Sequence, residues 1–124
     1  MSFVSLASLT WPEAGEIAAA GRVLGLVPLG AIEQHGPHLP LATDALIAEV
    51  LAREVAERLD VPVVVTPVPP GGLSTHHLGF PGTVTIPEAA FRAWVVASIE
   101  ALERIGIREI AVFSSDSRAQ LLQR

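Results

Sequence analysis

Three short apolar runs, which alternate with helical patterns, most strongly constrain what this 124-residue chain can fold into. The runs cover residues 23–29, 61–68 and 107–113, and each contains β-branched side chains. Continuous apolar strands that alternate with helices are typical of a parallel sheet covered on both faces. We therefore predict an α/β fold, a three-layer sandwich with a mostly parallel sheet and a βαβαβ core.

Two segments between the runs have the periodicity of amphipathic helices. The first begins at Thr43, the expected N-cap, and its predicted buried stripe comprises Ile47, Val50, Leu51, Val55 and Leu59. The second runs from Pro87 to Gly106, and its predicted buried stripe comprises Phe91, Val95, Ile99, Leu102 and Ile105. A shorter helix should precede the first run, because Thr10 can cap it and Pro12 fits its first turn.

The composition excludes several classes of protein. No apolar run reaches the roughly 18–20 residues of a membrane span, and the N-terminus lacks the pattern of a secretory signal. The chain has no cysteine, which excludes a disulfide framework and a thiolate zinc site and leads us to expect a cytoplasmic location. The net charge is −5, and the eight basic residues, all arginine, are scattered. Nucleic acid is therefore not an expected partner.

The length fits one domain over residues 1–124. Half of the residues are hydrophobic and only 17% are charged, against about 25% in a typical soluble domain. This shortage predicts apolar surface that a partner or further chain would cover.

The histidines indicate where a functional site should lie. In a parallel sheet, sites lie outside the carboxyl ends of the strands. Two long loops, 30–43 and 69–83, leave the predicted strands at that edge, as does the segment that begins at Ser114. All four histidines lie in the two loops, so we expect the site there.

The first loop contains candidate metal ligands. Glu33 and His35 are two residues apart, so on extended chain both side chains point the same way. Asp44, at the start of the predicted helix, could complete a mixed oxygen and nitrogen set that suits zinc, manganese or iron better than calcium. Such a set is typical of metal-assisted hydrolysis. In the ordinary alternative, Asp44 only caps the helix or sits in its first turn, and the other two are loop residues.

The second loop contains His76 and His77. Adjacent residues on extended chain point opposite ways, so we expect at most one of them to face the same pocket as Glu33. From spacing alone we favour a glycine-rich turn with two surface histidines. A nucleophilic pair of Ser74 with His77 is an alternative, although the chain has no Gly-x-Ser-x-Gly elbow and no evident third member. No glycine pattern of a phosphate-binding loop is present.

The two loops together resemble those of the creatininase (creatinine amidohydrolase) family. The first block is LGAIEQHGPHLP at residues 29–40, followed by Thr43 and Asp44. The second block is Ser74 with His77, followed by FPGT at residues 80–83. The order and spacing of both blocks match the family, and the resemblance extends from about Thr10 to Phe113.

The resemblance implies a three-layer α/β fold and a two-metal site, with zinc, manganese or iron, that hydrolyses amide-type C–N bonds. Known members open a cyclic amide, deformylate a formamidopyrimidine or trim a peptide in mycofactocin maturation, and the family commonly forms hexamers. In such a site Glu33 would bind one metal, His35 the other, and Asp44 would bridge them. We expect His77 to be catalytic, and Ser74 and His38 to bind the substrate.

The chain departs from the family pattern in three respects. Members are usually about twice as long, so residues 1–124 correspond to the N-terminal half of the family domain. Asp116 stands where an Asn-Gly-His motif supplies a metal-binding histidine, and we expect Asp116 to serve as a further ligand, with Arg118 close behind it. His76 stands where many members have glutamate.

These patterns predict a metal-dependent amidohydrolase that hydrolyses a non-peptide or cyclic amide C–N bond through a metal-activated water. Its expected partners are a small-molecule amide substrate and further copies of the chain, with no membrane involved. The alternative is a truncated or degenerate member that acts as a non-catalytic binding or assembly module. A third hypothesis is a truncated chain that does not fold stably.

Overall fold

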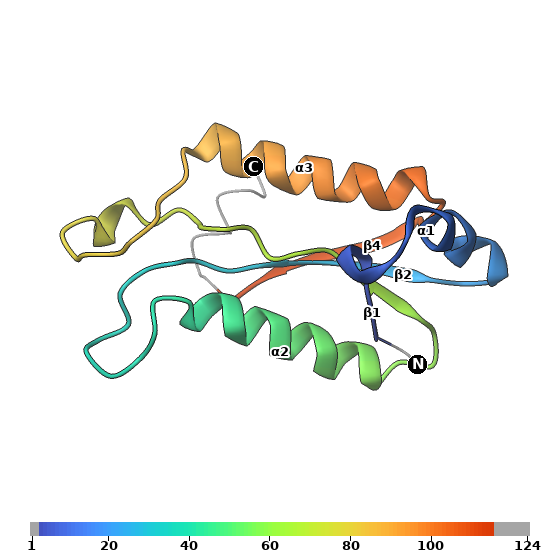
Figure 1. Ribbon diagram of the computed structural model, residues 1–124, viewed down its shortest axis with the longest axis horizontal. Coiled ribbons are helices and arrows are strands. Elements are labelled where there is room, and N and C mark those ends of the chain that lie inside the picture. The colour runs from blue at the N-terminus through green and yellow to red at the C-terminus, as the bar shows by residue number, and fades with distance from the viewer. Residues whose placement is uncertain (1–2, 116–124) are drawn as a thin grey trace.

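The protein forms one sheet of four parallel strands, shown in Figure 1. The computed structural model describes residues 3–115. The strands are β1 (Phe3–Ser5), β2 (Leu24–Leu29), β3 (Val63–Val65) and β4 (Glu109–Ser114), in the order β1-β3-β2-β4. The α-helices are α1 (Trp11–Ile17), α2 (Thr43–Glu57) and α3 (Glu88–Arg104), and the 3₁₀ turns are η1 (Leu6–Ser8), η2 (Ala18–Ala20) and η3 (Thr75–His77).

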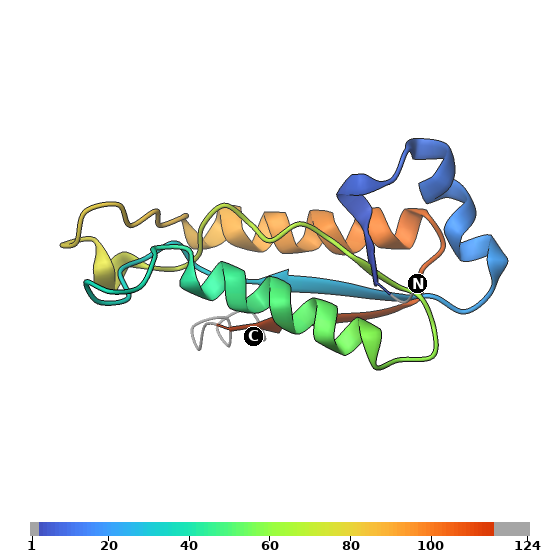
Figure 2. The same ribbon diagram turned by 60° about the horizontal axis from the view of Figure 1, so that its bottom comes forward.

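The helices make this fold a three-layer sandwich, which confirms the predicted architecture. Helix α2 covers one face of the sheet, and α1 and α3 cover the other (Figures 1 and 2). On the α3 face, Phe91, Val95 and Leu102 pack with Val27 and Val64. On the α2 face, the packed residues are Leu26, Ala52, Ala56, Val63 and Val65. No helix among residues 3–115 is long and apolar enough to span a bilayer.

Two helix predictions are confirmed in detail. At α1, the Thr10 hydroxyl accepts a hydrogen bond from the Glu13 N–H, and the Glu13 carboxylate accepts one from the Thr10 N–H. This reciprocal pair satisfies two amide groups that the helix itself leaves without partners. At α3, the predicted stripe faces the sheet, and Gly106 follows the helix at a φ of 96° that favours glycine.

Strand β1 was not expected from the sequence. It has only three residues, and it is held by parallel pairing of Phe3 with Val63 and of Ser5 with Val65. A segment this short carries too few residues for an alternating pattern to be recognised. It adds a strand beside β3, so the predicted βαβαβ core is extended by one strand.

Pro28 is tolerated inside β2 because β3 is shorter than the apolar run at 61–68. The Leu26 carbonyl accepts a hydrogen bond from the Thr66 N–H, so Leu26 faces β3. Pro28, two residues later, faces the same side but has no N–H to donate. Strand β3 has already ended at Val65, so the proline occupies a central strand without removing a ladder bond.

Helix α2 contradicts the predicted buried stripe. Val50 is 60% exposed and Leu51 is 44% exposed, and the other members of that stripe, Ile47, Val55 and Leu59, are also exposed. The side chains that face the sheet are Asp44, Ala48, Ala52 and Ala56. Small alanine side chains let the helix axis lie close to the sheet, and this close packing decides which face is buried.

The predicted N-cap of α2 is also wrong. The N-cap residue is Ala42, and Thr43 is the first residue of the helix. The Thr43 hydroxyl donates a 2.6 Å hydrogen bond to the Pro40 carbonyl instead of accepting one from the helix.

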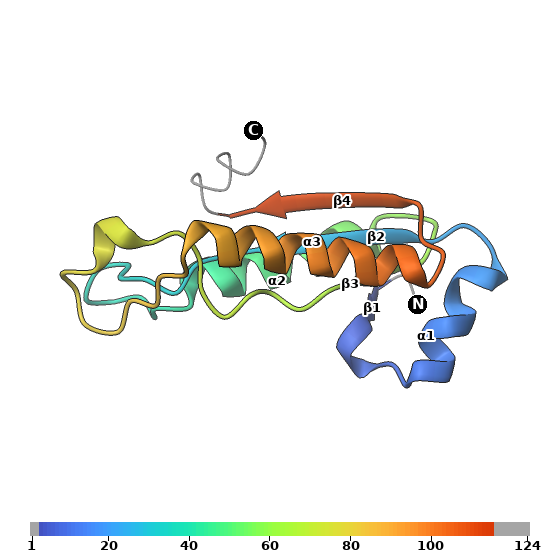
Figure 3. The same cartoon turned by 90° about the horizontal axis from the view of Figure 1, so that it is seen from above.

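Strand β4 forms one margin of the sheet, as Figure 3 shows. It pairs with β2 along its whole length, yet Glu109, Ala111 and Val112 are exposed. The prediction of a strand covered on both faces is therefore wrong for β4. A groove of about 480 Å³ lies between β4 and α2, and its lining includes Val55, Leu59, Ile110 and Ala111.

Candidate metal centre

The candidate site lies where the chain leaves the carboxyl ends of the strands, as the sequence predicts. The loop after β2 and the loop that carries η3 lie at the same end of the molecule (Figures 1 and 2). Gly30 opens the first loop, and a Cβ there would lie 2.7 Å from the Ala45 Cα. Only glycine therefore lets β2 pass this close to the start of α2, where Asp44 is 7% exposed.

His35 and Asp44 form one pair of ligand groups. The His35 Nε2 lies 3.2 Å from the Asp44 Oδ1, and the His35 Nδ1 lies 3.3 Å from the Glu33 carbonyl oxygen. A carbonyl can only accept, so the Nδ1 carries a hydrogen and, in a neutral ring, the Nε2 lone pair faces the aspartate. Two ligand atoms of a tetrahedral zinc ion, each about 2.0–2.1 Å from the metal, lie about 3.3 Å apart.

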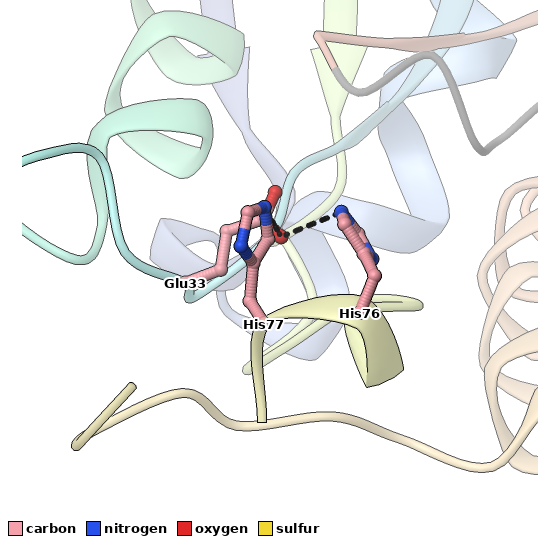
Figure 4. A group of neighbouring side chains, drawn as sticks. All are labelled: Glu33, His76 and His77. Carbon is pink, nitrogen blue, oxygen red and sulfur yellow. Dashed lines mark ion pairs between the residues drawn. The ribbon is translucent and has the colours of Figure 1, made fainter. Parts of the chain in front are cut away.

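Glu33 forms a second group with the two adjacent histidines, drawn in Figure 4. The Glu33 Oε2 lies 3.4 Å from the His77 Nε2 and 3.8 Å from the His76 Nε2. Glu33 is 5% exposed, whereas the histidines lie nearer the surface. The ligand atoms of these three residues lie within 4.8 Å of one another.

The prediction that at most one of these histidines faces Glu33 is therefore wrong. It assumed extended chain, but Thr75–His77 is a 3₁₀ turn, in which the Leu78 N–H donates to the Thr75 carbonyl. The two ring centroids lie only 3.9 Å apart, with the ring planes tilted by 45°, so the rings project to the same side. They form part of the candidate site and do not serve only as surface residues of a glycine-rich turn.

Gln34 organises this group, and sequence reasoning missed it. Its side-chain oxygen accepts a 2.9 Å hydrogen bond from the Gly36 N–H, and its side-chain nitrogen lies 3.1 Å from the His77 Nδ1. Gly36 has a φ of 75°, which lets the loop turn back on the Gln34 side chain. The one signal in the sequence that could have indicated Gln34 is its position between the candidate ligands Glu33 and His35.

The remaining predicted site residues lie apart from these contacts. Ser74 is fully buried, and its hydroxyl has no hydrogen-bond partner among residues 3–115. The nitrogens of the His77 ring are directed at Gln34 and Glu33, so the alternative Ser74–His77 nucleophilic pair is not formed. His38 is exposed beside Gly36. Asp116 lies outside the described residues.

Among residues 3–115, no set of three or more histidine, aspartate or glutamate side chains other than the Glu33 group brings its nitrogen and oxygen atoms within 4.8 Å of one another. His35 and Asp44 contact each other but are not members of that group. In the structure His35 contacts Asp44, and the carboxylate of Glu33 lies beside His76 and His77.

The comparisons with known proteins agree with this fold. A creatininase (creatinine amidohydrolase) family profile matches residues 7–118. The chain belongs to the creatininase family. A creatininase structure described as the manganese form superposes with a TM-score of 0.83 at 30% identity, over 96% of this chain and 48% of that one.

Two curated relatives also match parts of this chain. The chain is 49% identical over 75 residues to a mycofactocin precursor peptide peptidase of Mycolicibacterium smegmatis, covering 57% of this chain and 30% of the relative. It is 32% identical over 115 residues to a creatinine amidohydrolase of Pseudomonas putida, covering 90% of this chain and 44% of the relative. The chain therefore spans less than half the length of each of these two curated relatives.

Proposed function

We propose that this chain carries metal ligands of a metal-dependent amidohydrolase that cleaves the C–N bond of a small non-peptide or cyclic amide. The observation that carries the proposal is the His35–Asp44 pair, whose facing ligand atoms lie 3.2 Å apart at the carboxyl edge of the sheet. The name of the Pseudomonas relative supports an amide substrate. A cytoplasmic location, expected from the lack of cysteine, is part of the proposal.

The donor groups fit a divalent transition metal. Imidazole and carboxylate ligands suit zinc or manganese, and manganese is named in a family structure. A divalent ion held by Glu33, His35 and Asp44 would polarise an amide carbonyl and make water acidic enough to attack at neutral pH. The protein fixes the donors, because the Glu33 carbonyl orients the His35 ring and α2 holds Asp44 in place.

The other assigned residues have roles that follow from their positions. The His77 Nε2, beside the Glu33 carboxylate, is placed to hold or pass a proton. Ser74 offers a buried hydroxyl and His38 an exposed ring, and we assign both to substrate binding.

Metal content tests this function. We expect the purified chain to retain zinc or manganese after dialysis, and to hydrolyse small amides in a reaction that a chelator stops and added metal restores. His35→Gln and Asp44→Asn should each lower retention at least tenfold, because each removes one ligand. Asp60→Asn is the matched control, since Asp60 is an exposed acid outside the site. An unmutated chain with no metal above background would contradict the proposal.

The exposed groove between α2 and β4 favours a second candidate, a non-catalytic binding or assembly module. A monomeric domain rarely leaves so much apolar surface open to water. This candidate predicts a chain that folds and forms a homo-oligomer without metal and hydrolyses no amide. Chelator-sensitive hydrolysis by the purified chain would exclude it.

A further inference from the structure

We infer that Glu33, His76 and His77 form a binding site of their own for a divalent transition metal, zinc by preference. This inference deepens the proposed function, because Glu33 belongs to both ligand sets. The site differs from the His35–Asp44 pair, because its other two donors are His76 and His77. All three donors lie within residues 33–77, so the site needs no residue from beyond this chain.

The geometry of the three donors supports the site. The two distances from the Glu33 Oε2, 3.4 Å and 3.8 Å, approach the separation of about 3.3 Å between ligands of a tetrahedral zinc ion. Figure 4 shows both imidazole rings turned toward the Glu33 carboxylate. Two histidines with one carboxylate and an open fourth position is also a common ligand set for zinc.

The burial of Glu33 shows from which side an ion could reach its carboxylate. Its side chain is 6% exposed, against 35% for His76 and 23% for His77. A buried carboxylate is costly unless opposite charge or hydrogen bonds compensate it. The partly exposed histidine rings leave a path by which an ion could reach the carboxylate from solvent.

Gln34 controls whether His77 can serve as a ligand. As placed, its side-chain nitrogen points at the His77 Nδ1, which puts the ring hydrogen on the Nε2. A metal on the Nε2 requires the hydrogen on the Nδ1, facing an acceptor. Gln34→Glu offers two acceptor oxygens, one for the Gly36 N–H and one for the His77 Nδ1–H. We therefore expect Gln34→Glu to tighten metal binding.

The test is a zinc titration of the metal-free full chain, followed by calorimetry and by NMR of the histidine ring nitrogens. We expect the His76 and His77 ring signals to shift as zinc binds. His76→Gln and His77→Gln should each weaken binding at this site roughly 10- to 100-fold. His38→Gln, which alters an exposed histidine of the other loop, is the matched control and should bind zinc like the unmutated chain.

Gln34→Glu and Gln34→Met complete the design, because they change the site without removing a ligand. Gln34→Glu should bind zinc about tenfold more tightly, and Gln34→Met, which offers no acceptor to the His77 Nδ1–H, should not show this gain. These variants keep the inference testable if a histidine variant fails to fold. Unshifted His76 and His77 signals, or a Gln34→Glu chain that binds zinc no more tightly, would overturn it.

The outcomes also separate this site from the proposed function. Zinc bound through His76 and His77 in a chain that hydrolyses no amide would uphold the site and contradict the function. Metal retention and hydrolysis that depend on His35 and Asp44, with His76 and His77 ring signals that zinc leaves unshifted, would uphold the function and contradict the site.

Discussion

Gly30 shows at the scale of one residue how the fold creates its site. The missing side chain lets the end of β2 lie against the backbone of α2, because a Cβ at Gly30 would lie 2.7 Å from the Ala45 Cα and 2.8 Å from the Ala45 nitrogen. Backbone atoms cannot move aside as a flexible side chain can. The same contact sets the spacing between the first loop and Asp44.

We predict that Gly30→Ala destabilises the protein by about 1–3 kcal/mol, the usual range for overpacking. It should also weaken metal binding, because the first loop and α2 would be forced apart. Gly15→Ala is the matched control. Gly15 lies inside α1 with no atom near the added methyl, so this change should stabilise by about 0.5–1 kcal/mol. Urea denaturation measures both, and a Gly30→Ala chain as stable as the unmutated one would contradict the argument.

The site was predictable from sequence only in part. Spacing singled out Glu33, His35 and Asp44 as candidate ligands, and their side chains contact others of the candidate site in the structure. Spacing could not show that His76 faces Glu33 together with His77, because the direction of adjacent side chains depends on whether the chain is extended or forms a 3₁₀ turn. The role of Gln34 depends on contacts with Gly36 and His77, which local spacing does not specify.

At the scale of elements, α2 shows how a helical pattern can be placed correctly while its buried face is misjudged. Large apolar residues and alanines form two adjacent stripes on this helix, and periodicity alone favours the larger residues. The alanines pack on β2 and β3 instead, with Ala52 and Ala56 fully buried. Which stripe is buried depends on how closely the helix approaches the sheet, and that distance is a tertiary property.

Substitutions on the alanine stripe of α2 should therefore lower stability more than substitutions on the stripe of large apolar residues, the reverse of what side-chain hydrophobicity alone suggests. We predict that Ala56→Leu destabilises by about 1–3 kcal/mol, because the added atoms enter a packed layer. Leu51→Ala, at a side chain that is 44% exposed, should change stability by no more than about 0.5 kcal/mol. Thermal unfolding of both variants at low protein concentration tests this. A larger loss in Leu51→Ala than in Ala56→Leu would contradict the observed orientation.

At the scale of the whole molecule, the apolar composition and the short length both agree with the apolar groove that lies open beside β4. The chain spans 44% of the Pseudomonas relative, and its sheet has β4 at one margin with an apolar groove beside it. In the longer relatives, more than half of the protein remains to pack somewhere. The layers and the parallel sheet were predictable from the sequence, but an uncovered strand was not, because the pattern of a buried strand does not show whether a neighbour is present.

We predict that the purified chain self-associates through this groove, since only a second copy is then available to cover it. Val55→Glu places a charge in the groove and should weaken association at least tenfold, because a buried charge without a partner is costly. Val96→Glu is the matched control, at a residue of α3 that is 51% exposed and lies outside the groove lining. Sedimentation equilibrium measures both. A monomeric unmutated chain, or equal effects of the two changes, would contradict the prediction.

The strand order has a consequence for how the chain reaches its native state. Phe3 pairs with Val63, and Leu24 pairs with Glu109, while the Arg22 side chain meets that of Glu109 across 87 positions of sequence. Each ladder thus closes a long stretch of chain, and such non-local contacts slow folding. During synthesis the sheet cannot be completed until nearly all the described residues have left the ribosome. Refolding should therefore take milliseconds to seconds, well above the microsecond range of small helical bundles.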